Sequence, residues 1–174
     1  MDTTTMILVA AGLLGLIGGL YYYYYNKDKK ESLPVATGGA ENENIHSKQL
    51  RLQAYERLVI LAERISLPSV ISRNNEPSLG KRDMQQLLTA AIKQEFDYNL
   101  SQQIYVSPEA WEAIRNLKEQ NIHIINQVAT ILPEDISGIE MNKKIVEFIM
   151  NQPQGSMHTM VQEALSYEAR KLMN

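Results

Sequence analysis

The chain has 174 residues, of which 17 are basic and 20 are acidic, and its formal net charge is -3. This mildly acidic balance, without a basic stripe, argues against nucleic acid as a partner. The sequence contains no cysteine, which excludes thiol catalysis and thiolate metal sites.

An uncharged apolar segment near the N-terminus is the strongest signal. Residues 6–20 read MILVAAGLLGLIGGL, which as a helix is about 22 Å long and falls short of a hydrocarbon core of about 30 Å. Five consecutive tyrosines extend the segment to about 30 Å, and tyrosine prefers the membrane–water interface. These tyrosines are Tyr21, Tyr22, Tyr23, Tyr24 and Tyr25. We therefore predict a transmembrane anchor over residues 1–25, with the tyrosines as interface anchors.

Basic residues flank this anchor on one side only. Lys27, Lys29 and Lys30 follow the tyrosines, whereas no lysine or arginine precedes residue 6. The positive-inside rule then places the N-terminus outside and the rest of the chain in the cytoplasm. A cleaved secretory signal is the main alternative, but it would need a basic N-terminal region and a small-residue cleavage site. A buried core helix is the other alternative, and the one-sided lysines argue against it.

Small residues recur every four positions in the anchor, at Ala11, Gly15 and Gly19. They share one helix face, and small residues at this spacing let two membrane helices pack closely. This pattern predicts self-association, for example as a homodimer. Glycine and alanine are also common in membrane helices generally, so composition alone is the competing interpretation.

Residues 26–47 combine the basic flank with a polar segment that has no apolar period. That segment, residues 31–47, reads ESLPVATGGAENENIHS. Its proline and glycines favour a flexible, disordered linker. The remaining residues, 48–174, are enough for one soluble domain.

Two helices are expected in the first half of this domain. Apolar residues at spacings of three and four predict helices over 47–65, ended by Pro68, and over 81–100. Residues 69–80 contain turn formers and are expected to form a loop. Glu–Arg pairs at 56–57 and 63–64 could reach a neighbouring helix, although we favour a solvated flank.

Three further helices complete the domain. Ser107 and Pro108 carry a strong helix-start signal, and the helix is expected to end at Pro133. Ser137 and Glu140 have the spacing of a capping box that opens a fourth helix, and a fifth covers about 157–172. The predicted fold class is all-α: one transmembrane helix, a flexible linker and a bundle of about four to five helices.

The sequence shows no catalytic motif, cofactor fingerprint or metal-ligand spacing. We therefore expect no catalytic residue, no cofactor and no metal. Polar side chains gather where the second helix ends. These are Glu95, Asn99, Gln102, Gln103 and Tyr105. Amides there can bind free helix carbonyls, which is the structural interpretation that we favour. The functional alternative is a docking surface for a partner peptide.

Two segments carry a resemblance to known proteins. QAYERLVILAERI, at 53–65, and EFDYNLSQQIYVSPEAW, at 95–111, resemble a family of uncharacterised short bacterial proteins with an N-terminal membrane helix, a polar linker and a helical domain. The resemblance implies a retained anchor in a bacterial inner membrane. It implies no known activity, so no catalytic residues are transferred from it.

The sequence favours a non-enzymatic interaction or scaffold module that is held at the lipid bilayer and recruits a cytoplasmic protein. One alternative is an accessory subunit of a membrane complex that packs through its spanning helix. A weaker alternative is an enzyme or a sensor of small molecules.

Overall fold

The computed structural model describes residues 39–151 and 157–173, with side chains from Asn44 onward. The chain divides into two compact units, residues 1–45 and 46–174, and only the beginning of one helix is described in the first. The predicted anchor, including its small-residue face, its tyrosines and the lysines beyond them, lies outside the described residues. Within the described ranges, no helix combines the length and apolar character needed to cross a membrane.

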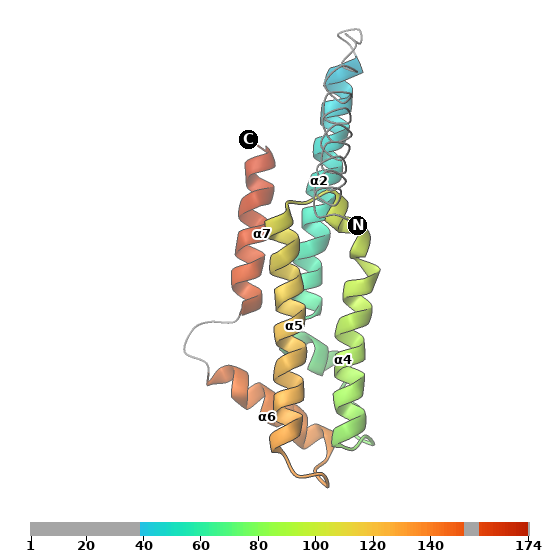
Figure 1. Ribbon diagram of the computed structural model, residues 1–174, viewed down its shortest axis with the longest axis vertical. Helices are drawn as coiled ribbons and strands as arrows, with labels where there is room; N and C mark the ends of the chain where they lie inside the picture. Colours follow the sequence, from blue (N-terminus) through green and yellow to red (C-terminus); the bar gives the residue numbers. More distant parts are fainter. Residues whose placement is uncertain (1–38, 152–156, 174) are drawn as a thin grey trace, which may run out of the picture. The chain divides into compact units, whose positions relative to one another are not determined.

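The described residues form α-helices without any strand, so the all-α fold class is confirmed for this part of the chain (Figure 1). The elements are α2 (Gly39–Arg64), α3 (Leu67–Arg73), α4 (Lys81–Tyr98), the 3₁₀ helix η1 (Leu100–Ile104), α5 (Pro108–Ile131), α6 (Gly138–Met150) and α7 (Met157–Met173). One isolated antiparallel bridge joins Gly80 to Ser137.

The first described helix begins earlier than the sequence pattern predicts. α2 starts at Gly39, so residues 39–47 are helical and do not belong to a flexible linker. Alanine and glutamate occupy positions 40, 41 and 43, and both are strong helix formers. The prediction relied on apolar periodicity, which this polar stretch lacks.

Pro68 lies in the first turn of a short helix, α3, which the sequence pattern did not predict. α2 ends at Arg64, and α3 occupies part of the stretch expected to be a loop. Ser66 caps α3, its Oγ accepting a hydrogen bond from the backbone N–H of Ser69 at 3.4 Å. Proline is tolerated in the first turn of a helix, where its missing N–H would have no partner. The bundle therefore has one more helix than we predicted.

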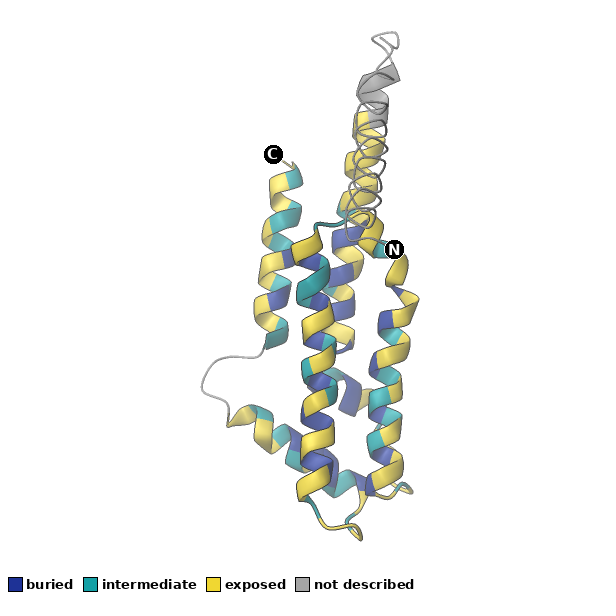
Figure 2. Cartoon of the chain, viewed as in Figure 1, coloured by how far each residue is buried: buried dark blue, intermediate teal, exposed yellow. Residues whose placement is uncertain are grey.

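The core lies between helices that contact one another along their apolar faces. α4, α5 and α7 lie side by side, with α5 in contact with both α4 and α7 (Figure 1). Figure 2 shows buried positions on the sides where these helices face one another. The largest fully buried side chains are Tyr55, Leu58, Leu61, Ile65, Met84, Leu88, Ile92, Ile114, Leu117, Ile125, Met141 and Ile145. Leu50, the first leucine of the apolar pattern over 47–65, is 47% exposed and does not join the core.

Local capping signals place two helix starts correctly. The Ser107 Oγ accepts a hydrogen bond from the Ala110 N–H at 3.0 Å, and α5 begins at Pro108. The Ser137 Oγ accepts from the Glu140 N–H at 3.2 Å, and α6 begins at Gly138. These contacts satisfy backbone donors that the first turn of a helix leaves free.

Candidate functional site

An open groove of about 580 Å³ lies between α2 and α4. We call it the α2/α4 groove. Its lining residues are Arg57, Ile60, Leu61, Arg64, Gln94, Glu95, Tyr98 and Asn99. Ile60 is 51% exposed and Tyr98 is 76% exposed, so apolar and aromatic surface is accessible there beside charged groups.

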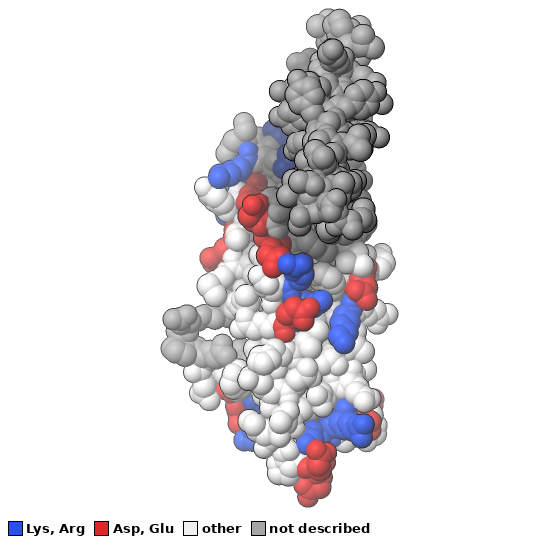
Figure 3. All heavy atoms as spheres, viewed as in Figure 1, with Lys and Arg blue, Asp and Glu red and all other residues white. Residues whose placement is uncertain are grey.

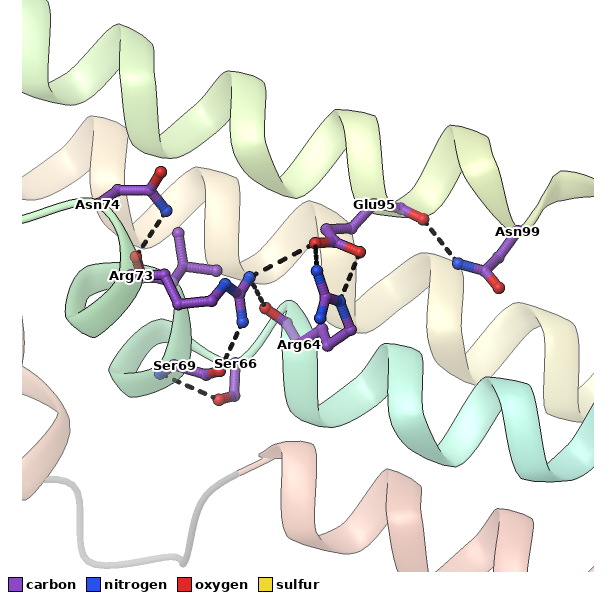
Figure 4. A network of polar contacts seen from close by, with 8 residues as sticks. Arg64, Ser66, Ser69, Arg73, Asn74, Glu95 and Asn99 are labelled. Atoms are coloured by element: carbon purple, nitrogen blue, oxygen red, sulfur yellow. Dashed lines mark hydrogen bonds and ion pairs between the residues drawn. The ribbon is translucent and has the colours of Figure 1, made fainter.

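Arg64 and Glu95 form a bidentate ion pair across this groove. The Arg64 Nε donates to the Glu95 Oε2 at 2.7 Å, and the Arg64 Nη2 donates to the Glu95 Oε1. Figure 4 shows the guanidinium and the carboxylate facing one another from separate helices. The hydrogen bond from Arg64 lowers the pKa of Glu95, although partial burial opposes this effect. The same bond raises the pKa of Arg64.

A second arginine, Arg73 of α3, contacts both partners of this ion pair. The Arg73 Nη2 lies 3.7 Å from the Glu95 Oε1 and donates to the backbone oxygen of Arg64 at 2.8 Å. Its Nη1 donates to the Ser69 Oγ at 2.8 Å (Figure 4). Arg73 therefore satisfies a free carbonyl at the end of α2 while it holds α3 against the carboxylate of α4. Side chains from α2, α3 and α4 therefore hold the ion pair in place.

The structure divides the polar patch expected from the sequence. Glu95 and Asn99 line the α2/α4 groove. The Asn99 Nδ2 donates to the Glu95 backbone oxygen at 2.9 Å, as the structural interpretation predicts for an amide at a helix end. Gln102, Gln103 and Tyr105 lie on or just after η1 and do not line the groove, and the Gln102 Nε2 donates to the Ser101 Oγ at 3.2 Å.

Sequence reasoning missed most of the groove. The additional lining residues are Arg57, Ile60, Leu61, Arg64, Gln94 and Tyr98. The repeated Glu–Arg pairs were the available signal. Glu63 and Arg64 are exposed, as expected for a solvated flank, and they also reach neighbouring helices, which was the alternative left open. Arg64 binds α4, and the Gln162 Nε2 of α7 donates to the Glu63 Oε2 at 3.2 Å. Only the relative positions of α2, α4 and α7 show which partners these side chains reach.

The ion pair predicts a pH-dependent contribution to stability. We expect Glu95→Gln to lower the free energy of unfolding at pH 7 by about 1 kcal/mol, a modest value because Arg64 is half exposed and solvent screens the pair. The pKa of Glu95 is lower in the folded protein than the unfolded value of about 4.3, so this stability is present above that pH and is lost as the pH falls through the folded pKa. Urea denaturation at pH 7 and pH 3 measures the difference.

The exposed Glu56 provides a matched control for that experiment. Glu56→Gln should change the free energy of unfolding little at either pH. A deficit for Glu95→Gln that has the same size at pH 3 as at pH 7 would show that the carboxylate charge is irrelevant to the effect.

A second polar cluster joins α2, α5 and α7. Tyr55, which is 1% exposed, donates from its hydroxyl to the Glu168 Oε2 at 2.5 Å and accepts from the Ser107 N–H at 3.1 Å. The Ser107 Oγ also lies 2.6 Å from the Glu168 Oε2. Each member has partners within the cluster, so we assign it a structural role in holding α7.

Basic and acidic side chains lie intermixed on the face drawn in Figure 3, with a wide uncharged area between the groups. Neither sign of charge forms a continuous field over that face.

Comparison with known proteins gives a family but no activity. No curated protein matches the sequence, and no solved structure matches the chain. The model of a family of unknown function, DUF7935, matches residues 1–172. The match includes the N-terminal segment as well as the helical domain. Because it covers nearly the whole chain, the protein belongs to the DUF7935 family of unknown function.

Proposed function

We propose that this protein is a membrane-tethered helical adaptor that binds a cytoplasmic partner protein in the α2/α4 groove. The tether is the apolar segment predicted over residues 1–25, and the activity is binding, not catalysis. The observation that carries the proposal is the fixed Arg64–Glu95 pair beside accessible Ile60 and Tyr98. Exposed aromatic side chains and arginines together are typical of protein interfaces.

The charges of the groove indicate what the partner presents. Arg57 is exposed in the groove, and among the described residues none forms an ion pair with it. Arg64, in contrast, already holds a carboxylate. One uncompensated cation beside apolar side chains favours a partner segment that carries a carboxylate flanked by apolar residues. The intermixed charges in Figure 3 support a protein partner over nucleic acid.

Affinity capture of the full-length protein from its native host, in mild detergent, tests this proposal. We expect Arg57→Glu to reduce the captured partner by about tenfold or more, because the reversed charge repels the partner's carboxylate. Arg82→Glu makes the same charge change at an exposed position of α4 that does not line the groove, and it should leave capture unchanged. A chain lacking residues 1–30 should still bind the partner, since the groove is intact. Equal capture by the wild type and Arg57→Glu would contradict docking in the groove.

The accessory-subunit alternative makes the opposite prediction. It is supported by the spacing of Ala11, Gly15 and Gly19, which suits packing against another spanning helix. In that case the partner would be lost when residues 1–30 are removed or when Gly15 and Gly19 are replaced by isoleucine. Arg57→Glu would have no effect.

A further inference from the structure

A second concave site, separate from the α2/α4 groove, lies between α3 and α6. It is an open pocket of about 510 Å³, a volume within the range of small-molecule sites. The site is lined by Ile71, Ser72, Asn75, Ile139, Asn142, Lys143, Val146 and Glu147. The lining residues of α6 recur at spacings of one, three and four, so one continuous face of that helix forms a wall.

One buried polar atom in this wall has no partner. Asn142 is 3% exposed, and its Nδ2 donates to the Asn75 Oδ1 at 3.2 Å and contacts the Met84 Sδ at 3.5 Å. The Asn142 Oδ1 forms no hydrogen bond with any described residue. Buried acceptors in folded proteins are nearly always satisfied. Among the described residues this amide oxygen has no donor, so it is available to accept a hydrogen bond from a ligand, and the exposed Asn75 is the neighbour able to move and admit one.

The charges at the rim of this pocket are already paired. The Lys143 Nζ lies 3.4 Å from the Glu140 Oε2, and the Lys144 Nζ lies 2.8 Å from the Glu147 Oε2. The remaining walls are largely aliphatic, with side chains from Ile71, Ile139 and Val146. A charged ligand would lose its hydration there without a free counter-charge, so the pocket suits a neutral molecule.

We propose that the pocket between α3 and α6 binds a small neutral molecule with an apolar body and one hydrogen-bond donor, an alcohol or a primary amide. The apolar body packs on the aliphatic walls contributed by the two helices. The donor binds the Asn142 Oδ1 after Asn75 turns aside. This site is independent of the adaptor function proposed for the groove.

Two isomeric probes, hexan-1-ol and 1-methoxypentane, test the proposal because only the alcohol has a donor. The full-length protein is placed in lipid nanodiscs, since a detergent tail could itself occupy the pocket, and the methyl groups of Ile71, Ile139 and Val146 are observed by NMR. We expect saturable shifts of these methyl signals. The alcohol-to-ether preference of the wild type should exceed that of Asn142→Leu by about tenfold, the effect of one hydrogen bond. Comparing variants in identical nanodiscs cancels the partitioning of the probes into lipid.

Two further variants keep the test decisive. Asn116→Leu makes the same change at an exposed position of α5 and should retain the wild-type preference. Val146→Trp fills the pocket and leaves Asn142 in place, so the saturable shifts at Ile71 and Ile139 should disappear for both probes even if Asn142→Leu does not fold. An equal alcohol-to-ether preference in the wild type and Asn142→Leu would overturn the proposal. That result is expected if a buried water, and not the ligand, donates to the Asn142 Oδ1. Shifts that persist in Val146→Trp would overturn it as well.

Discussion

Gly138→Ala is expected to destabilise the protein by about 2 kcal/mol. A Cβ atom at Gly138 would lie 2.8 Å from the Met84 Cβ and 2.9 Å from the Leu79 backbone oxygen. Neither atom can withdraw easily, because Met84 is fully buried and the Leu79 oxygen accepts a hydrogen bond from the Gly138 N–H at 2.9 Å. Urea denaturation, followed by the fluorescence of Trp111, the only tryptophan in the sequence, measures the loss.

The sign of the stability change in Gly138→Ala distinguishes crowding at this position from a simple gain in helix propensity. Alanine is a better helix former than glycine by about 1 kcal/mol, so an uncrowded Gly138 at the start of α6 would give a gain in stability. Gly80, on the other side of the bridge to Ser137, is the matched control. A Cβ at Gly80 would meet nothing within 4 Å, and its φ of -75° suits alanine. Gly80 is the N-cap residue of α4, where alanine is less favourable than glycine, so Gly80→Ala should cost less than about 1 kcal/mol. Equal losses for the two variants would contradict close packing at Gly138.

Tyr55→Phe is expected to destabilise the protein by about 2 kcal/mol, because it removes one hydroxyl that makes two hydrogen bonds. The partly buried N–H of Ser107 loses its acceptor, and the carboxylate of Glu168 loses a donor at 2.5 Å. Hydrogen bonds to charged groups contribute about 1.5–3 kcal/mol, and a buried group without a partner is costly. The aromatic ring stays, so the hydrophobic core is unchanged. Chemical denaturation of the full chain again measures the effect.

Tyr167→Phe is the control for this prediction. Tyr167 lies on α7, is 57% exposed and has the Lys171 ammonium 4.7 Å from the centre of its ring. Phenylalanine preserves that ring, so the free energy of unfolding should change by less than about 0.5 kcal/mol. If Tyr55→Phe were as mild as Tyr167→Phe, the cluster of Tyr55, Ser107 and Glu168 would contribute little to holding α7.

Local signals in the sequence were sufficient for some helix boundaries. Ser107 and Ser137 each cap a helix through a backbone N–H three residues ahead, and such a contact depends on a few neighbouring residues only. Pro68 was ambiguous for the same reason, since proline suits both the residue after a helix and the first turn of the next one. The burial of Val70 and Ile71 decides for α3, and burial depends on the tertiary fold.

The candidate site depends on contacts that the sequence pattern does not contain. Arg64 and Glu95 lie on different helices, and their meeting depends on how α2 and α4 are aligned. The same holds for Asn121, whose Nδ2 donates to the Ile65 backbone oxygen at 2.8 Å and is buried between α5 and the end of α2. The sequence pattern identified Glu95 and Asn99 as polar residues where the second helix ends. It could not show that Arg57, Ile60 and Tyr98 share a groove with them.

Site-specific photo-crosslinking in native membranes tests the adaptor proposal most directly. Benzoylphenylalanine replaces Tyr98 in the full-length chain, and His123, exposed on α5, serves as the control position. The account predicts one protein adduct from position 98 in the membrane fraction. This adduct should be lost with Arg57→Glu, retained with Arg82→Glu and absent from position 123. An adduct from position 98 that survives Arg57→Glu, or an adduct that forms only from a label in the segment 6–20, would contradict docking in the α2/α4 groove.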